Sequence, residues 1–167
     1  HSKVEYDPKA GKNFLHPGRQ ALIRYEGDEI GYLGEVHPQT ADNYGIGTRA
    51  YVAVIDILQV VKHATFDRKY EGIARFPAVN RDISMVVPKE IMVGQIEQII
   101  AQRGGKILEN YELFDIYEGD QIQKGYKSVA YSITFRSKEK TLEEAEVTAA
   151  MKKILNGLEG LGIQLRQ

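Results

Sequence analysis

The sequence predicts an α+β fold in which a four-stranded antiparallel sheet has two helices on one face. Two segments, 93–100 and 147–158, repeat apolar residues at helical spacing, and the segments around them alternate apolar and polar residues as strands do. These elements follow the order strand, helix, strand, strand, helix, strand, which is that of a ferredoxin-like βαββαβ sandwich. In such a sandwich the first and third strands are central, and the face opposite the helices is open.

A partial mixed β/α segment precedes the sandwich. Within residues 1–65 we expect a hairpin with strands at 21–25 and 30–36, because the stretch Glu26–Glu29 between them contains Gly and Asp, which tolerate positive φ. The run 50–58 is almost continuously apolar, which predicts a strand covered on both faces. These pieces do not close a domain by themselves, so we expect them to be the end of a larger sheet.

Glycine and proline residues predict further features of this segment. Gly31 and Gly34 interrupt the second arm of the hairpin, and glycines within strands mark a close approach of another backbone. Pro38 suits the first turn of a short helix that ends near Gly45. The charged stretch 66–77, which contains Gly and Pro, predicts a connector to the sandwich.

Residues 78–167 contain the predicted sandwich. Its strands are expected at 81–87, 108–117, 128–136 and, as a short final strand, 163–165. Phe114 and Ile116 are expected to point into the core near the end of the second strand. The pair Gly104-Gly105 ends the first helix.

A capping box is predicted at the start of the second helix. The Thr141 hydroxyl is placed to accept a hydrogen bond from the Glu144 amide, and the Glu144 carboxylate is placed to reach back to residue 141. This arrangement predicts that the helix starts directly after Thr141.

Four side chains are predicted to share the open face: Ser84, Asp115, Tyr117 and Ser128. A surface of small serine side chains beside one aromatic ring and one carboxylate suits a nucleobase. The ring offers a stacking plane, while the carboxylate and the hydroxyls recognise polar base edges. Alternation alone leaves other interpretations open. Tyr117 is compatible with an ordinary strand-end tyrosine, Asp115 with a turn cap, and the serines with an exposed sheet face.

Composition excludes several classes of site. The chain has no cysteine, which excludes disulfides, thiolate zinc sites and thiol nucleophiles, and its four histidines lack metal-like spacing. Its net charge of −1 argues against strong non-specific nucleic-acid binding, so we do not expect a DNA-binding protein.

We expect no membrane segment and a cytoplasmic location. The first residue is His1 rather than methionine, which suggests a piece of a longer protein.

A family resemblance rests on four stretches in the second half: Phe76–Ser84, Leu113–Tyr117, Gly125–Ser128 and Lys140–Val147. Over about residues 70–167 the chain resembles the ferredoxin-fold anticodon-binding domain that closes the β subunit of bacterial phenylalanyl-tRNA synthetase. Two stretches of the first half, Leu15–Ala21 and Ile30–Pro38, resemble the end of the catalytic-like core of that subunit, which has a class II synthetase fold without an active site.

The resemblance implies a contact with the anticodon stem-loop of tRNA(Phe). By position, Tyr117 stacks on the first anticodon base, a guanine, while Asp115 and Ser128 recognise its polar groups and Ser84 lies beneath it. The reaction served is the ATP-dependent attachment of phenylalanine to tRNA by the α subunit. The resemblance implies no catalytic site in this chain, ATP and Mg²⁺ only in the full enzyme, and contact with the α subunit only through β-subunit parts outside this chain.

Three arginines are candidate phosphate contacts: Arg81, Arg136 and Arg166. Two other functions remain open for this fold. One is a subunit-docking or small-ligand regulatory domain. The other is an acylphosphatase-like hydrolase, which needs an anion-cradling loop after the first strand, and Val87–Glu90 offers no such loop.

Overall fold

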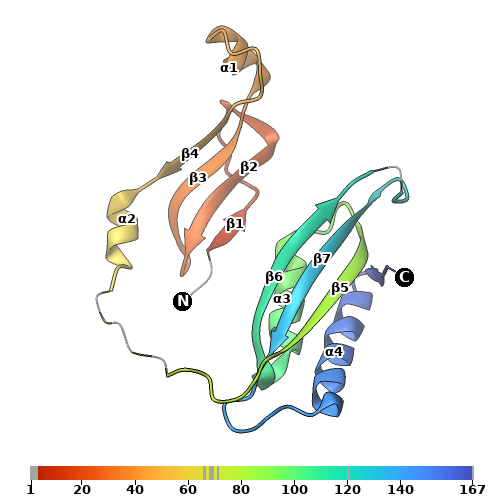
Figure 1. The fold of residues 1–167 in the computed structure, drawn as a ribbon. Coiled ribbons are helices and arrows are strands. Elements are labelled where there is room, and N and C mark those ends of the chain that lie inside the picture. The colour runs from red at the N-terminus through yellow and green to blue at the C-terminus, as the bar shows by residue number, and fades with distance from the viewer. Residues whose placement is uncertain (1–3, 66, 68–69, 71, 120, 167) are drawn as a thin grey trace. The chain divides into compact units, whose positions relative to one another are not determined.

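The computed structural model describes residues 4–65, 67, 70, 72–119 and 121–166 (Figure 1). Contacts between residues divide the chain into two compact units, residues 1–70 and residues 71–167, called unit 1 and unit 2. The division falls within the segment expected to be a connector, of which residues 66, 68, 69 and 71 lie outside the described part.

Unit 1 contains a four-stranded antiparallel sheet with the strand order β1-β2-β3-β4. Its elements are β1 (Glu5–Asp7), β2 (Leu15–Tyr25), β3 (Asp28–Val36), α1 (Pro38–Asn43), β4 (Tyr51–Ile55) and α2 (Ile57–Lys62). The predicted hairpin and the predicted short helix at Pro38 are confirmed. The two-residue turn between β2 and β3 has positive φ at both central residues, 50° at Glu26 and 88° at Gly27, which is the type I′ geometry that matches strand twist.

The apolar run 50–58 does not form the single covered strand that was predicted. β4 ends at Ile55, because the Asp56 side chain accepts hydrogen bonds from Leu58 N (2.9 Å) and Gln59 N (3.2 Å) and so starts helix α2. All five residues of β4 are exposed in this chain rather than covered on both faces. The pattern therefore predicted apolar character correctly but not the helix cap within it.

The glycines of β3 mark close backbone contacts, as predicted. A Cβ atom on Gly31 would meet the backbone carbonyl of Val54 in β4, with the Ile55 Cα at 3.1 Å. A Cβ on Gly34 would lie 2.8 Å from the Arg19 carbonyl oxygen in β2. Both neighbours are backbone atoms, so a side chain cannot be accommodated by a simple rotamer change.

Unit 2 is a ferredoxin-like βαββαβ sandwich, as predicted. Its elements are β5 (Val79–Pro88), α3 (Val93–Arg103), the 3₁₀ turn η1 (Gly105–Ile107), β6 (Leu108–Tyr117), β7 (Tyr126–Phe135), α4 (Glu144–Glu159) and β8 (Gln164–Leu165). The strand order is β6-β7-β5-β8, so the first and third strands, β5 and β7, are central. Both helices lie on one face of the sheet, and the other face is open (Figure 1).

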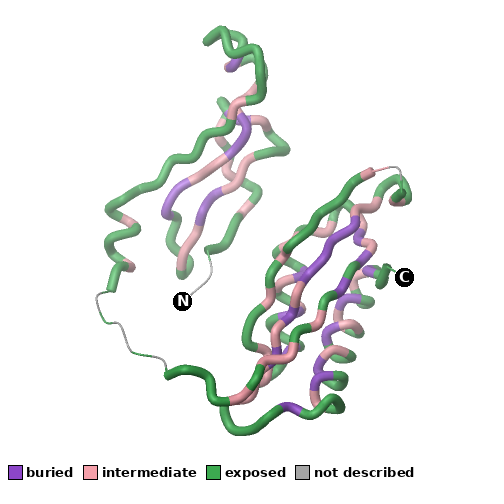
Figure 2. The backbone as a smooth tube through the Cα atoms, viewed as in Figure 1, coloured by how far each residue is buried: buried purple, intermediate pink, exposed green. Residues whose placement is uncertain are grey.

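The core of unit 2 lies between that sheet and its helices. In β7 the alternate residues Val129, Tyr131, Ile133 and Phe135 are each 0% exposed. They pack in one cluster with residues of β5, α3 and α4, namely Ile83, Met85, Val87, Ile96, Ile100, Val147, Ile154 and Leu158. The buried positions follow β7 and the helices in Figure 2. This alternation fixes which side chains of β5 and β7 face away from the helices.

A β-bulge interrupts β6 and corrects the prediction for Phe114. Leu113 pairs with Tyr131 and Asp115 pairs with Ala130, which leaves Phe114 as an extra residue between two consecutive partners. Phe114 is therefore 58% exposed instead of buried. Because the bulge resets the alternation, Leu113 packs against the core while Asp115 opposes Ala130 on the other face.

Ile116 differs from its prediction for another reason. It pairs with Val129, whose side chain is in the core, so Ile116 lies on the helix-covered face as expected. It is nevertheless 47% exposed, because it lies on the edge strand β6 near the end of that strand. The expected direction was right, and the expected burial was wrong.

The cap of α4 also differs from the prediction. The helix begins at Glu144, with Glu143 as its N-cap, rather than directly after Thr141. The Glu143 amide donates to Glu146 Oε2 at 3.1 Å, which is the reciprocal half of a capping box two residues later than expected. Leu142, immediately before the cap, belongs to the same core cluster as Val147, and such a pair fixes where the chain enters a helix.

Candidate nucleic-acid interface

The open face of unit 2 brings together the four residues predicted to form the site. Residues directly opposite each other on antiparallel strands share a face and lie about 5 Å apart. One row across the sheet is Ser84, Ala130 and Asp115, and the next row is Val86, Ser128 and Tyr117. We call these six residues the platform. Their paired positions place Tyr117 and Ser128 on the face opposite α3 and α4.

The platform has small, buried side chains on its central strand and more exposed side chains on the two flanking strands. Ser128 and Ala130, on the central strand β7, are each only 4% exposed, and side chains of both neighbouring strands flank them. Tyr117, on the edge strand β6, is 40% exposed, and Asp115 and Ser84 are exposed as well. The result is a small polar floor with an accessible phenol ring and carboxylate along one side, which fits a flat base better than a bulky side chain.

Two further residues lie on the open face without having been predicted as site residues. Tyr126 pairs with Pro88 and lies two positions before Ser128 on β7, so its ring faces the same side. It was missed because the strand was predicted to start at 128, whereas β7 starts directly after Gly125, whose φ is 92°. Gln164 of β8 pairs with Val86 and extends the second row of the platform.

Of the three candidate phosphate contacts, Arg166 lies beside the platform. Its amide donates to the Ser84 carbonyl oxygen at 2.8 Å, which extends the β8 pairing by one residue. Since Gln164 lies on the open face, Arg166 two positions later lies there too. This places a guanidinium group in the row of Ser84.

Arg81 and Arg136 are placed differently. Arg81 lies two positions before the core residue Ile83 on β5, so it is on the helix-covered face of the sheet. Its Nη2 contacts both carboxylate oxygens of Glu144 at 2.6 Å. Arg136 comes directly after the last residue of β7. At the usual rise per residue of a strand, it lies about 26 Å from Ser128. Its Nε lies 2.9 Å from Glu109 Oε1. Both side chains are engaged away from the platform, and their role as phosphate contacts stays a prediction.

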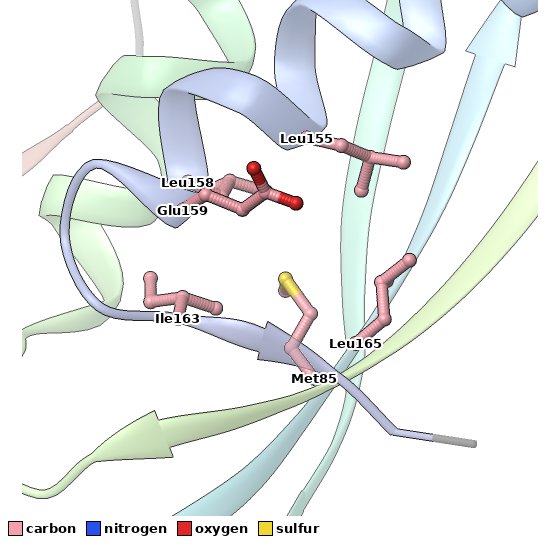
Figure 3. A pocket seen from close by; sticks show the side chains of 6 residues that line it. All are labelled: Met85, Leu155, Leu158, Glu159, Ile163 and Leu165. Atoms are coloured by element: carbon pink, nitrogen blue, oxygen red, sulfur yellow. The ribbon is translucent and has the colours of Figure 1, made fainter.

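Two hollows in unit 2 differ greatly in volume. Figure 3 shows a pocket between the end of α4 and β8 that encloses about 10 Å³, enough for at most one water molecule. Its lining residues are Met85, Leu155, Leu158, Glu159, Ile163 and Leu165. A far larger open hollow of about 630 Å³ lies along the loop after Tyr117, next to the platform, and includes Gly119, Lys124 and Tyr126 in its wall.

Neither a metal site nor a membrane-spanning helix is found among the described residues. None of their His, Asp and Glu side chains form a group of three that could hold a metal ion. Within that same part of the chain, every helix is too short or too polar to cross a membrane.

The fold and the platform together define a ferredoxin-like module with a small polar and aromatic surface on its open sheet face. Comparison with known families agrees with this description. The family described as "Ferredoxin-fold anticodon binding domain" matches residues 74–166, and the chain belongs to that family. A second family, described as "Phenylalanyl tRNA synthetase beta chain CLM domain", matches residues 1–57.

Individual relatives agree with both matches. The chain is 40% identical over 166 residues to the phenylalanine–tRNA ligase β subunit of Clostridium acetobutylicum, which covers 99% of this chain and 21% of the relative. Identity is 42% over 165 residues to that of Clostridium tetani, with 98% and 21% covered, and 41% over 145 residues to that of Bacillus subtilis, with 87% and 18% covered. The chain thus spans about a fifth of the length of these relatives. The predicted family resemblance is confirmed.

Proposed function

We propose that this chain recognises the anticodon stem-loop of tRNA(Phe) as part of the β subunit of phenylalanine–tRNA ligase. The observation that supports this most strongly is the strand register, which gathers Ser84, Asp115, Tyr117 and Ser128 in two adjacent rows of an open sheet face. In this proposal the chain serves ATP-dependent aminoacylation in the cytoplasm. The chemistry, with ATP and Mg²⁺, takes place in the α subunit, which the remaining parts of the β subunit contact.

Each platform side chain has a chemical role toward a guanine base. The Tyr117 ring offers a face for stacking, which every base can use. The Watson–Crick edge of guanine presents two N–H donor groups beside one carbonyl acceptor, so a carboxylate such as that of Asp115 complements the donors. The small residues Ser128, Ala130 and Ser84 leave room for the base to approach the sheet. A carboxylate near RNA phosphates is otherwise unfavourable, which favours a base-reading role for Asp115.

The charge of the chain fits base reading better than phosphate neutralisation. The net charge is −1, and affinity from phosphate contacts depends on clustered cations. Near the platform, Lys89 is paired with Glu118 at 2.6 Å, and the hydrogen bond and charge of this lysine hold the pKa of the Glu118 carboxyl below its ordinary value. Arg166 is the cation placed in a platform row. We therefore expect this chain to supply selectivity and other parts of the enzyme to supply most of the tRNA affinity.

Tyr117→Ala tests the proposed function. Loss of the stacking plane should weaken binding of an anticodon stem-loop RNA by about 2 kcal/mol, or roughly 30-fold. The measurement is a fluorescence titration of labelled RNA with the 167-residue chain, followed by the KM for tRNA in the assembled synthetase. Tyr44→Ala is the matched control, because Tyr44 is an 80% exposed tyrosine in unit 1. Equal affinity of the Tyr117 variant and the unaltered chain would refute a stacking role.

Asp115→Asn tests base discrimination. The amide replaces one of the two carboxylate acceptors by an N–H donor group that opposes a guanine donor, so the preference for guanine over adenine at the first anticodon position should fall about 10-fold. Titrations with two stem-loops that differ at this base measure the ratio of the two dissociation constants. A uniform loss of affinity for both RNAs, with the ratio unchanged, would mean that Asp115 does not read the base.

A further inference from the structure

We propose that Gly119 is a positioning residue for the Tyr117 ring. The absence of a side chain at position 119 lets the phenol lie against the loop backbone, and this contact holds the ring where a base can stack on it. The inference rests on the proposed function, since it explains how the aromatic plane is fixed before RNA binds.

The contact between the two residues is defined by geometry. A Cβ atom built on Gly119 would overlap the Tyr117 side chain, with Oη and Cζ as the nearest atoms and Cε1 at 3.0 Å. The hydroxyl end of the ring therefore lies over the Gly119 Cα. Tyr117 remains 40% exposed, so this contact supports the ring without covering it.

The conformation of Gly119 does not itself demand glycine. Gly125 and Gly162 have positive φ values of 92° and 76°, a region that side chains rarely adopt, whereas Gly119 is not among the positive-φ residues. Alanine at 119 would thus be acceptable to the backbone. The ring of Tyr117 is the obstacle, and this separates a positioning role from an ordinary turn glycine.

The loop that supports the ring is held at several points. The Gly119 carbonyl accepts a hydrogen bond from the Ile122 amide at 2.9 Å, which closes a turn. The Lys89 amide, at the end of β5, donates to the Gly125 carbonyl at 3.0 Å, and the Lys89 side chain pairs with Glu118. Because the turn and the adjacent strand end restrain position 119, an added methyl group should displace the ring more readily than the loop.

Displacement of the ring has a specific consequence for binding. Rotation about χ1 of Tyr117 moves the ring between separate staggered wells, so the stacking plane is lost rather than slightly tilted. We expect Gly119→Ala to weaken binding of the anticodon stem-loop about 10- to 30-fold, close to the effect of Tyr117→Ala. Stability should stay the same or rise slightly, because alanine restricts the unfolded chain more than glycine does.

A double-mutant cycle tests this inference. The single variants G119A and Y117A, the double variant and the unaltered chain are titrated with the same stem-loop RNA. We expect G119A to have no further effect in the Y117A background, since there is then no ring to displace. Gly94→Ala is the matched control, because a Cβ at Gly94 meets nothing within 4 Å and its φ is not positive. NMR spectra of the RNA-free chains, with tyrosine ring labels, should show altered Tyr117 signals in G119A and unaltered ones in the Gly94 variant.

The possible outcomes separate the two proposals. If Y117A weakens binding and G119A does not, the positioning role is wrong and the proposed function stands. If G119A weakens binding equally with and without the Tyr117 ring, Gly119 acts by itself and the inference is overturned. If Y117A leaves binding unchanged, the stacking role given to Tyr117 in the proposed function fails, and the inference fails with it. Unaltered ring signals in free G119A contradict the contact directly, whatever the RNA titrations show.

Discussion

Phe135→Ala is expected to destabilise unit 2 by about 3–5 kcal/mol, the cost typical of truncating a buried aromatic side chain. Phe135 is 0% exposed and ends the row of core residues on β7. It pairs with Val79 on β5 and with Leu108 on β6, so its ring packs where both neighbouring strands meet the helices. The same strand positions Ser128 on the opposite face, so loss of this packing should also remove the platform.

Urea unfolding followed by NMR signals of unit 2 measures this effect separately from unit 1. Phe114→Ala is the matched control, because Phe114 is a phenylalanine on the same sheet that is 58% exposed at the bulge. We expect its substitution to change the free energy of unfolding by less than about 0.5 kcal/mol. Equal losses for the two variants would mean that the core of unit 2 does not lie where the register places it.

The architecture of unit 2 was predictable because its sequence pattern and its packing agree. In β7 every second residue from Val129 to Phe135 is fully buried, and period-two alternation identifies such a strand without further information. In α4 the residues Val147, Ile154 and Leu158 repeat at helical spacing and are buried in the structure. Once the order of elements was known, the topology followed, because few arrangements connect such elements without crossings.

Three features of the structure were not predictable from the sequence. Each depends either on a contact between residues that are distant in the sequence or on which residue caps a helix. The bulge at Phe114 depends on how β6 pairs with β7, and alternation within β6 alone gives no sign of it. The α4 cap lies at Glu143 because Leu142 enters the core, although Thr141 is the stronger cap by residue type. In unit 1, the Asp56 cap divides an apolar run that otherwise resembles one strand.

The candidate site was predicted more completely in its placement than in its chemistry. The shared face of Ser84, Asp115, Tyr117 and Ser128 followed from topology, and the paired positions agree with it. Their roles toward a base remain proposals, since pairing positions side chains without identifying a ligand. Tyr126 was missed because strand ends are set by turn geometry, which a residue pattern locates only to within a few positions.

Gly31→Ala is expected to separate β4 from β3 in unit 1, at a cost of about 3 kcal/mol. The added methyl group would meet the Val54 carbonyl, and a backbone atom in a paired strand cannot move without breaking the ladder. The adjacent hydrogen bond from the Asp56 amide to the Ile30 carbonyl, at 2.8 Å, should then open. Amide hydrogen exchange at Asp56 reports this opening directly, and the urea midpoint of unit 1 reports the total loss.

Gly47→Ala separates the steric effect of Gly31→Ala from the general effect of replacing glycine. A Cβ on Gly47 meets nothing within 4 Å, and its φ is not positive, so alanine there should be neutral or slightly stabilising. We expect Asp56 exchange to accelerate in the Gly31 variant alone. If the Asp56 amide stays equally protected in both variants, β3 and β4 are not as close at Gly31 as their register requires.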